Sequence, residues 1–375
     1  MIIKNATILN EQFKFQLADL VLSDTIDQII PKGKIEEKSG GTSSDKDILD
    51  LQGDLLIPGL IDIHTHGAVG VDAMDENLNY EKWRNYLLEN GITTFFPATV
   101  TGDFDKITKA LKNLQQAAGV YLEGPFLNAE KNGAHDKTLI CPADPDFIET
   151  IKDKITVIAI APEIEGNMDV IKSLVSKGIL VTIAHSSADY MTGREAYANG
   201  ATLLTHTFNA MNPLTHREPN LIGAALENDK VFCEAISDGV HVHPAVIKIL
   251  YRILGPRRML LISDSMAATG YPDGEYLLGN LKVIVKDHIA HTEYGAIAGS
   301  TTNLMGMVRK AVSFGLPLED VIQMATLTPA RATGLDNVKG SIAAGKKADL
   351  IWCKRDLTIC GVIKDGVLVP GITCS

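Results

Sequence analysis

The chain has 375 residues, of which 45% are hydrophobic and 22% charged, and its formal net charge is -11 at pH 7. This composition is ordinary for a soluble globular protein. It excludes nucleic acid and anionic membrane as the main partners, because both require a basic surface. A small anionic substrate stays compatible with it, since a few local Arg or His residues suffice to bind one.

The five cysteines are odd in number and include no Cys-x-x-Cys pair. We therefore expect neither a disulfide framework nor a thiolate zinc site, and we expect a reducing compartment. The first residues are too few and too polar for a signal peptide, and no apolar run reaches membrane-spanning length. The expected location is the cytoplasm.

Residues 1–54 are typical of short β-strands joined by turns. A polar loop rich in Gly and Ser is predicted at Lys38–Asp47. The β-rich runs are Ile2–Ile3, Ala6–Leu9, Asp19–Leu22 and Ile26–Ile30.

From residue 55 the pattern changes to short apolar runs that alternate with helical segments. Several helices end on a glycine, such as Gly91 and Gly178, which suits a left-handed C-cap. Eight β/α units predict a (β/α)8 TIM-like barrel. A doubly wound open sheet is the alternative, but no Gly-x-Gly-x-x-Gly follows an early strand. The eight runs are Leu56–Ile63, Ile92–Pro97, Gly119–Leu122, Ile155–Ile160, Ile179–Ala184, Ala201–Thr205, Val231–Ile236 and Met259–Ile262.

The last hundred residues predict an insertion and a return to strands. Tyr271–Ala298 resembles a hairpin, and two helices are expected near 302–314 and 318–327. The runs Ala348–Trp352 and Ile359–Val369 are again β-rich. We predict a small β-sandwich domain built from both chain ends, residues 1–54 and 335–375, with the barrel of residues 55–334 between them.

Ionisable residues follow the apolar runs at the points where barrel strands are expected to end. In such a barrel, groups at the C-terminal ends of the strands converge on one face. Residues two apart on a strand point to the same side, so His64 and His66 can bind one ion together. The six residues are His64, His66, Glu123, His185, His206 and Asp264.

This mixture of imidazoles and carboxylates suits zinc or another borderline divalent metal. A catalytic metal keeps one position open for water and lowers the pKa of that water to about 7, which gives hydroxide as a nucleophile. Asp264 is placed to take a proton and later give it to a leaving amine. The six residues together predict hydrolysis of an amide.

Each of these residues taken alone has a structural interpretation. A single histidine is usually a core or loop residue, and a single carboxylate often caps a helix. Four histidines at strand ends of one barrel are hard to explain in that way. The other histidines, His216, His243, His288 and His291, receive no primary role.

Several loop residues are weaker candidates. His135 follows the third run and can donate to a carbonyl oxygen, or it is a solvated loop residue. The turn at Asn209 and Ala210 can direct backbone N–H groups at an anion, or it is only a turn. Arg217 follows in the same loop, and His241 ends the seventh run as a plausible substrate contact.

Eight segments together match one family pattern: Pro58–Gly67, Glu123–Asn128, Gly133–His135, Ala184–Ser186, Thr205–Met211, His216–Pro219, Asp238–His241 and Ser263–Asp264. By these segments the chain resembles the N-acetylglucosamine-6-phosphate deacetylases of the amidohydrolase superfamily. Glu-Gly-Pro-Phe and His-x-x-Asn-Ala-Met are more specific to that family than His-x-His, which many amidohydrolases share. The resemblance covers nearly the whole chain.

The resemblance implies roles for the site residues. Glu123, His185 and His206 would hold the principal metal, and His64 and His66 a second one bridged by Glu123. Asp264 would be the general base and then the acid, and His135 would polarise the acetyl carbonyl. The implied substrate contacts are Ala134, His135, Asn209, Ala210, Arg217 and His241.

The implied reaction releases acetate from N-acetylglucosamine 6-phosphate and leaves glucosamine 6-phosphate, as a step of amino-sugar catabolism. One or two ions per subunit are expected, zinc first, with iron, manganese and cobalt as alternatives, and a homodimer is implied. Two departures, Asn220 for glycine and Ser265 for alanine, leave the sugar preference open. A related N-acetylated sugar phosphate is therefore an alternative substrate. A non-catalytic scaffold with the same fold is the alternative from another class.

Overall fold

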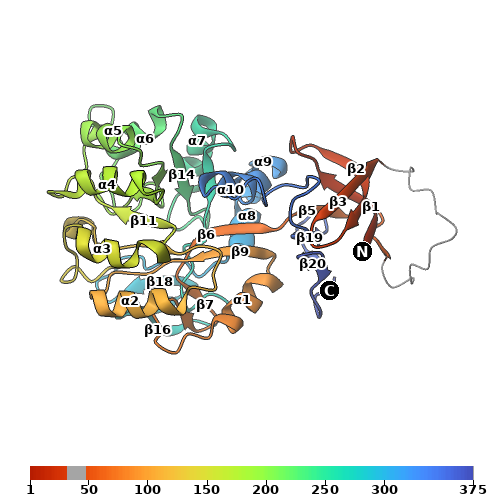
Figure 1. Ribbon diagram of the computed structural model, residues 1–375, viewed down its shortest axis with the longest axis horizontal. Coiled ribbons are helices and arrows are strands. Elements are labelled where there is room, and N and C mark those ends of the chain that lie inside the picture. The colour runs from red at the N-terminus through yellow and green to blue at the C-terminus, as the bar shows by residue number, and fades with distance from the viewer. Residues whose placement is uncertain (32–47, 375) are drawn as a thin grey trace.

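The computed structural model describes residues 1–31 and 48–374 of the chain (Figure 1). The loop predicted at Lys38–Asp47 lies outside the described residues. A helix-rich part and a strand-rich part lie at opposite ends of the long axis in Figure 1. The strand-rich part contains both ends of the chain.

The helix-rich part is built on parallel strands that close into a barrel. β6 pairs with β9, an isolated bridge joins Ala98 to Tyr121, and β10 to β15 pair in chain order. The backbone N–H of Asp264, after β15, donates to the carbonyl of His64 in β6 at 2.9 Å and closes the ring. This confirms the predicted barrel and not the alternative, a doubly wound open sheet. The strands are β6 (Leu60–Thr65), β9 (Ile92–Pro97), β10 (Tyr121–Leu122), β11 (Val157–Ile160), β12 (Leu180–Ile183), β13 (Leu203–Leu204), β14 (Phe232–Ala235) and β15 (Met259–Leu261).

The helices pack around the barrel through apolar faces and begin at polar caps. The side chain of Asp103, for example, accepts from the backbone N–H of Lys106 at the start of α2, whose buried face includes Ile107 and Leu111. The helices are α1 (Tyr80–Glu89), α2 (Phe104–Asn113), α3 (Pro145–Ile151), α4 (Asn167–Ser176), α5 (Tyr190–Ala198), α6 (Asn220–Glu227), α7 (Pro244–Leu254), α8 (Leu304–Ser313), α9 (Leu318–Met324) and α10 (Leu327–Ala332). None of the described helices is long and apolar enough to cross a membrane.

The strand-rich part is one hydrogen-bonded ladder in the order β21-β20-β19-β5-β1-β2-β3, with β4 paired to β1. A sandwich was expected. Side chains from both halves of this ladder fill one core, as those of the two layers of a sandwich do. The two halves are nevertheless hydrogen-bonded to each other in one continuous ladder. The strands are β1 (Ile2–Leu9), β2 (Phe15–Leu22), β3 (Ile26–Pro31), β4 (Ile48–Asp50), β5 (Leu55–Pro58), β19 (Leu350–Cys353), β20 (Ile359–Lys364) and β21 (Val367–Leu368).

The predicted run Leu56–Ile63 is two strands and not one. Leu55–Pro58 forms β5 between β1 and β19 of the terminal ladder, and Leu60–Thr65 forms β6 of the barrel. Gly59 lies between them, where a Cβ would collide with the side chain of Thr93. The run therefore links the two parts through a close approach that only glycine allows.

Two further features refine the sequence predictions. The insertion has three antiparallel strands and not two, β16 (Gly274–Leu278), β17 (Leu281–Lys286) and β18 (Ile289–Thr292). A short pair, β7 (Gly67–Ala68) and β8 (Val71–Asp72), follows β6. No disulfide framework was expected, but one disulfide is present, because β21 returns the chain along β20 and brings Cys374 to Cys360.

Candidate active site

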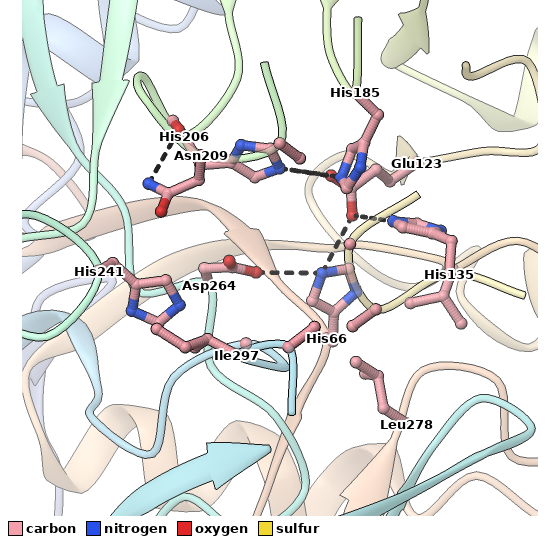
Figure 2. A pocket seen from close by; sticks show the side chains of 16 residues that line it. His66, Glu123, His135, His185, His206, Asn209, His241, Asp264, Leu278 and Ile297 are labelled. Carbon is pink, nitrogen blue, oxygen red and sulfur yellow. Dashed lines mark hydrogen bonds and ion pairs between the residues drawn. The ribbon is translucent and has the colours of Figure 1, made fainter. Parts of the chain in front are cut away.

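The six ionisable residues predicted at strand ends meet at one mouth of the barrel, and Figure 2 shows all of them except His64. His64 lies in β6 and His66 just beyond it, while Glu123 directly follows β10. His185, His206 and Asp264 follow β12, β13 and β15 within three residues. All six are at least nine-tenths buried. The structure therefore brings the set together, and the role of each member remains a prediction.

Three of the six residues adopt a left-handed backbone conformation. The φ angles of His185, His206 and Asp264 are 43°, 25° and 47°. Such angles are uncommon for residues with a side chain, and local backbone strain of this kind concentrates at functional sites. The strained turns direct these three side chains inward at the points where their strands end.

Glu123 lies at the centre of the cluster. Its Oε1 is 3.1 Å from Nε2 of His206 and 3.3 Å from Nε2 of His185. Its Oε2 is 3.2 Å from Nε2 of His66 and 3.5 Å from Nε2 of His64. The two carboxylate oxygens therefore face two separate histidine pairs, which is the arrangement that a carboxylate bridging two ions needs.

Hydrogen bonds fix the tautomers of three of the histidines. Nδ1 of His66 faces the carbonyl of Ala98 at 3.0 Å, and Nδ1 of His185 faces the carbonyl of Lys131 at 2.7 Å. Nδ1 of His64 faces a carboxylate oxygen of Glu234 at 3.1 Å. Because these oxygens only accept, each Nδ1 carries the hydrogen, and in the neutral ring Nε2 presents a lone pair toward Glu123.

These lone pairs give a test of whether the cluster fits a metal ion. Nε2 of His185 and Nε2 of His206 lie 3.1 Å apart, and Nε2 of His64 is buried without a hydrogen-bond partner among the described residues. Imidazole nitrogens and a carboxylate converging in this way, with their outer nitrogens held by acceptors, suit a divalent cation. Two overlapping groups have their possible ligand atoms within 4.8 Å of one another: His64, His66 and Glu123, and Glu123, His135 and His185.

The electrostatics of the cluster favour positive charge between the carboxylates. Burial, with the nearby His135, lowers the pKa of His185 to about 4, so its ring is neutral at pH 7. Burial opposes ionisation of Glu123, but the surrounding histidines outweigh it and hold its pKa well below the ordinary value. Burial likewise disfavours protonation of His66, but Asp264 and Glu123 raise its pKa to about 9.

His135 is held in the tautomer that donates into the cavity. The backbone N–H of Thr101 donates to Nδ1 of His135 at 3.1 Å, and the Thr101 hydroxyl lies 2.9 Å from the same atom. Nδ1 is therefore an acceptor, and in the neutral ring the hydrogen is on Nε2, 3.4 Å from Glu123. Thr101 was not predicted as a site residue.

A cavity of about 270 Å³ opens on this cluster. Ala134, Asn209, Ala210 and His241 line it, as their predicted roles require, and the insertion adds Leu278 and Ile297 (Figure 2). His241 is oriented by Asp238, whose carboxylate lies 2.7 Å from its Nδ1. Arg217 is exposed and does not line the cavity within one chain, so the structure does not bring it to the other candidates.

Sequence reasoning also missed two buried groups that contact His64. Tyr121 in β10 stacks on its ring with centroids 4.3 Å apart, and Glu234 in β14 accepts from its Nδ1. A carboxylate inside the apolar run Val231–Ile236 was the available signal for Glu234. After the fourth barrel strand, β11, Glu163 accepts hydrogen bonds from Ser186 and Ser187 beside His185, and no hydrogen bond joins it to a candidate metal ligand among the described residues.

The amidohydrolase family model matches residues 55–369, which is most of the chain. The chain belongs to the amidohydrolase family. Among curated amidohydrolase relatives, it is 38% identical to N-acetylglucosamine-6-phosphate deacetylase of Vibrio furnissii over 81% of this chain and 80% of the relative. It is 35% identical to N-acetylgalactosamine-6-phosphate deacetylase of Escherichia coli O157:H7 over 81% and 85% of the two chains.

A solved structure extends the likeness to three dimensions. N-acetyl-D-glucosamine-6-phosphate deacetylase of Mycobacterium smegmatis, an aspartate-to-alanine variant in complex with N-acetyl-D-glucosamine-6-phosphate, superposes with a TM-score of 0.89. It is 32% identical and covers 98% of each chain. The similarity therefore includes the terminal ladder as well as the barrel.

Proposed function

We propose that this amidohydrolase removes the acetyl group from N-acetylglucosamine 6-phosphate and gives glucosamine 6-phosphate and acetate, as a step of amino-sugar catabolism. The observation that carries the proposal is a carboxylate-bridged histidine cluster that shares one cavity with Asp264 and His135. Relatives named for this reaction match over four-fifths of the chain. The intact set disfavours a non-catalytic scaffold, because an unused group of buried ionisable residues is costly to keep converged.

The chain's own residues supply the acid-base chemistry. A divalent ion held by Glu123 with the histidines would supply Lewis acidity and a nucleophile at neutral pH. Asp264, whose Oδ1 lies 3.1 Å from Nε2 of His66, takes the proton of the attacking water and passes it to the departing sugar amine. The Nε2–H of His135 donates to the acetyl oxygen as it gains negative charge.

Burial would raise the pKa of Asp264, but the hydrogen bond from His66 and the nearby histidine charges lower it to about 2. Asp264 is therefore ionised before substrate binds, as a general base must be. His66 contacts both Asp264 and Glu123, so it holds the base beside the ligand cluster. His64 and His66 would bind the second ion of the pair.

For the substrate, we propose that Asn209, Ala210 and Arg217 bind the phosphate and that Ala134 and His241 contact the sugar. Arg217 lies outside the cavity of its own chain. N-acetylgalactosamine 6-phosphate is a second candidate substrate, favoured by the Escherichia coli relative. Acetate release from the two sugar phosphates and from unphosphorylated N-acetylglucosamine tests both candidates. Equal rates with and without phosphate would refute the sugar-phosphate assignment.

We further propose zinc as the metal, a homodimer and a cytoplasmic location, together with a domain division at residues 54/55 and 334/335. Mixed His and carboxylate ligands support zinc, although iron, manganese and cobalt use the same ligands. β5 lies in the terminal ladder, so that ladder extends a few residues past the first boundary. Metal analysis of the purified protein and sedimentation velocity test the metal and the dimer.

A further inference from the structure

Glu234 is a buried carboxylate to which the reaction proposed above gives no role. It lies in β14 between Cys233 and Ala235, and the side chains of all three are fully buried. A carboxylate in such surroundings is costly unless its hydrogen bonds compensate for the lost water. Its contacts therefore indicate why it is there.

Both of its contacts lead to the candidate metal ligands. Oε2 accepts from Nδ1 of His64 at 3.1 Å and from the backbone N–H of His206 at 3.2 Å. His64 and His206 belong to opposite halves of the cluster, because they face different oxygens of Glu123. The other oxygen, Oε1, has no hydrogen-bond partner among the described residues.

We infer that Glu234 is a positioning residue of the metal centre, which keeps the His64 ring in the tautomer whose Nε2 binds an ion. Because the Glu234 carboxylate accepts from Nδ1–H, the lone pair of the His64 ring is on Nε2. The negative charge of the carboxylate also makes Nε2 a stronger metal ligand. The same oxygen anchors the backbone of His206, whose φ of 25° needs support from its surroundings. The inference deepens the proposed metal-dependent function and rests on it.

Glu234→Gln is the sharpest probe of this role. A glutamine can place its amide oxygen where Oε2 lies and keep both hydrogen bonds, so the variant removes the charge and little of the shape. Mutation of a partner of this kind, here by removal of its charge, lowers metal affinity by about 10- to 100-fold. We expect this loss at the ion bound through His64 and a much smaller change at the ion bound through His185.

The experiment titrates chelator-stripped protein with Co²⁺ in competition with a chromophoric chelator and records the visible absorption of bound Co²⁺. It compares the wild type, Glu234→Gln, His64→Ala and the double variant. Asp62→Asn is the matched control, because this buried carboxylate accepts from the backbone N–H of His64 but has no hydrogen bond to an imidazole among the described residues. Glu234→Asp keeps the charge and should retain affinity better than Glu234→Gln.

We expect Glu234→Gln to weaken the Co²⁺ that is lost in His64→Ala by about 10- to 100-fold and to change its spectrum, while Asp62→Asn stays within about twofold of the wild type. In the His64→Ala background, Glu234→Gln should have no further effect. Wild-type affinity in Glu234→Gln overturns the inference, and so does a loss that persists without His64, which would indicate a merely structural role. A wild type that binds no Co²⁺ overturns the proposed function as well, so the two failures are distinguishable.

Discussion

The Nε2 atoms of His185 and His206 lie 3.1 Å apart, although Nε2 of neutral His185 has no hydrogen to share. The carbonyl of Lys131 holds the hydrogen of His185 on Nδ1, and the pKa of His185 is lowered to about 4 by burial, so no proton bridges the pair from that side at pH 7. The lone pair on Nε2 of His185 and the carboxylate of Glu123 are therefore available to a cation.

Removal of the metal should therefore destabilise the protein as well as stop turnover. An ion present at 100 times its dissociation constant stabilises the native state by about 2.7 kcal/mol. For a chain of this size we expect chelation to lower the melting temperature by a few degrees and zinc to restore it. Calorimetry of stripped and reloaded protein measures the shift, and identical melting curves would contradict a bound metal.

Asp264→Asn should abolish measurable turnover and leave the metal bound. An asparagine fills the same space but cannot take a proton, and a positioned general base contributes about 10²- to 10⁴-fold to the rate. Because Asp264 contacts only His66 and His64 among the ligand histidines, the group of Glu123, His185 and His206 stays complete. Acetate release and metal content are measured on the same sample, and full activity would refute the mechanism.

Thr101 should act on the reaction through His135. Thr101→Val removes one of the two donors that keep Nδ1 of His135 an acceptor, whereas Thr101→Ser keeps both. We expect kcat to fall about three- to tenfold in the valine variant with KM little changed, because the His135 donor acts on charge that develops in the transition state. The serine variant should be near the wild type, and a loss of the same size there would show that Thr101 matters only for packing.

Much of the fold was predictable because strands and helices have local signals. The run Ile92–Pro97 coincides with β9, and the glycines at 91 and 178 end helices with positive φ. The split at Gly59 was not predictable, because it depends on Thr93 of a neighbouring strand meeting that glycine in space. The disulfide of Cys374 was hidden for a similar reason, since it follows from the return of β21 along β20.

The residues of the candidate site likewise fall into those that the sequence predicts and those that it does not. His64, Glu123 and His185 were predictable because barrel topology brings strand ends together whatever the details of packing. Thr101 and Glu234 were not, because their roles depend on which nitrogen of a neighbouring imidazole they face. A carboxylate inside an apolar strand run was the available hint for Glu234, and the left-handed turns at His185 and His206 have no local sequence signature.

The barrel and the terminal ladder are joined by an ion-pair network that should contribute to stability. Asp349, next to β19 and 5% exposed at its side chain, lies 2.9 Å from Nζ of Lys364 and 3.0 Å from Nζ of Lys339. Lys339 also donates to the Thr94 hydroxyl in β9 of the barrel at 2.9 Å. One buried carboxylate therefore pairs with the charges of two lysines at the junction of the barrel and the terminal ladder.

Asp349→Asn should destabilise the protein because it leaves Lys339 without its counter-ion and Lys364 with the half-exposed Asp365 alone. Breaking a fully buried pair costs about 3–5 kcal/mol. Both lysines are partly exposed, so water recovers some of that cost and we expect about 1–3 kcal/mol. Asp365→Asn is the matched control, since that carboxylate also pairs with Lys364 but is half exposed, and its loss should change stability by less than about 0.5 kcal/mol. Urea unfolding measures both variants, and equal midpoints for Asp349→Asn and Asp365→Asn would show that burial of the network adds nothing.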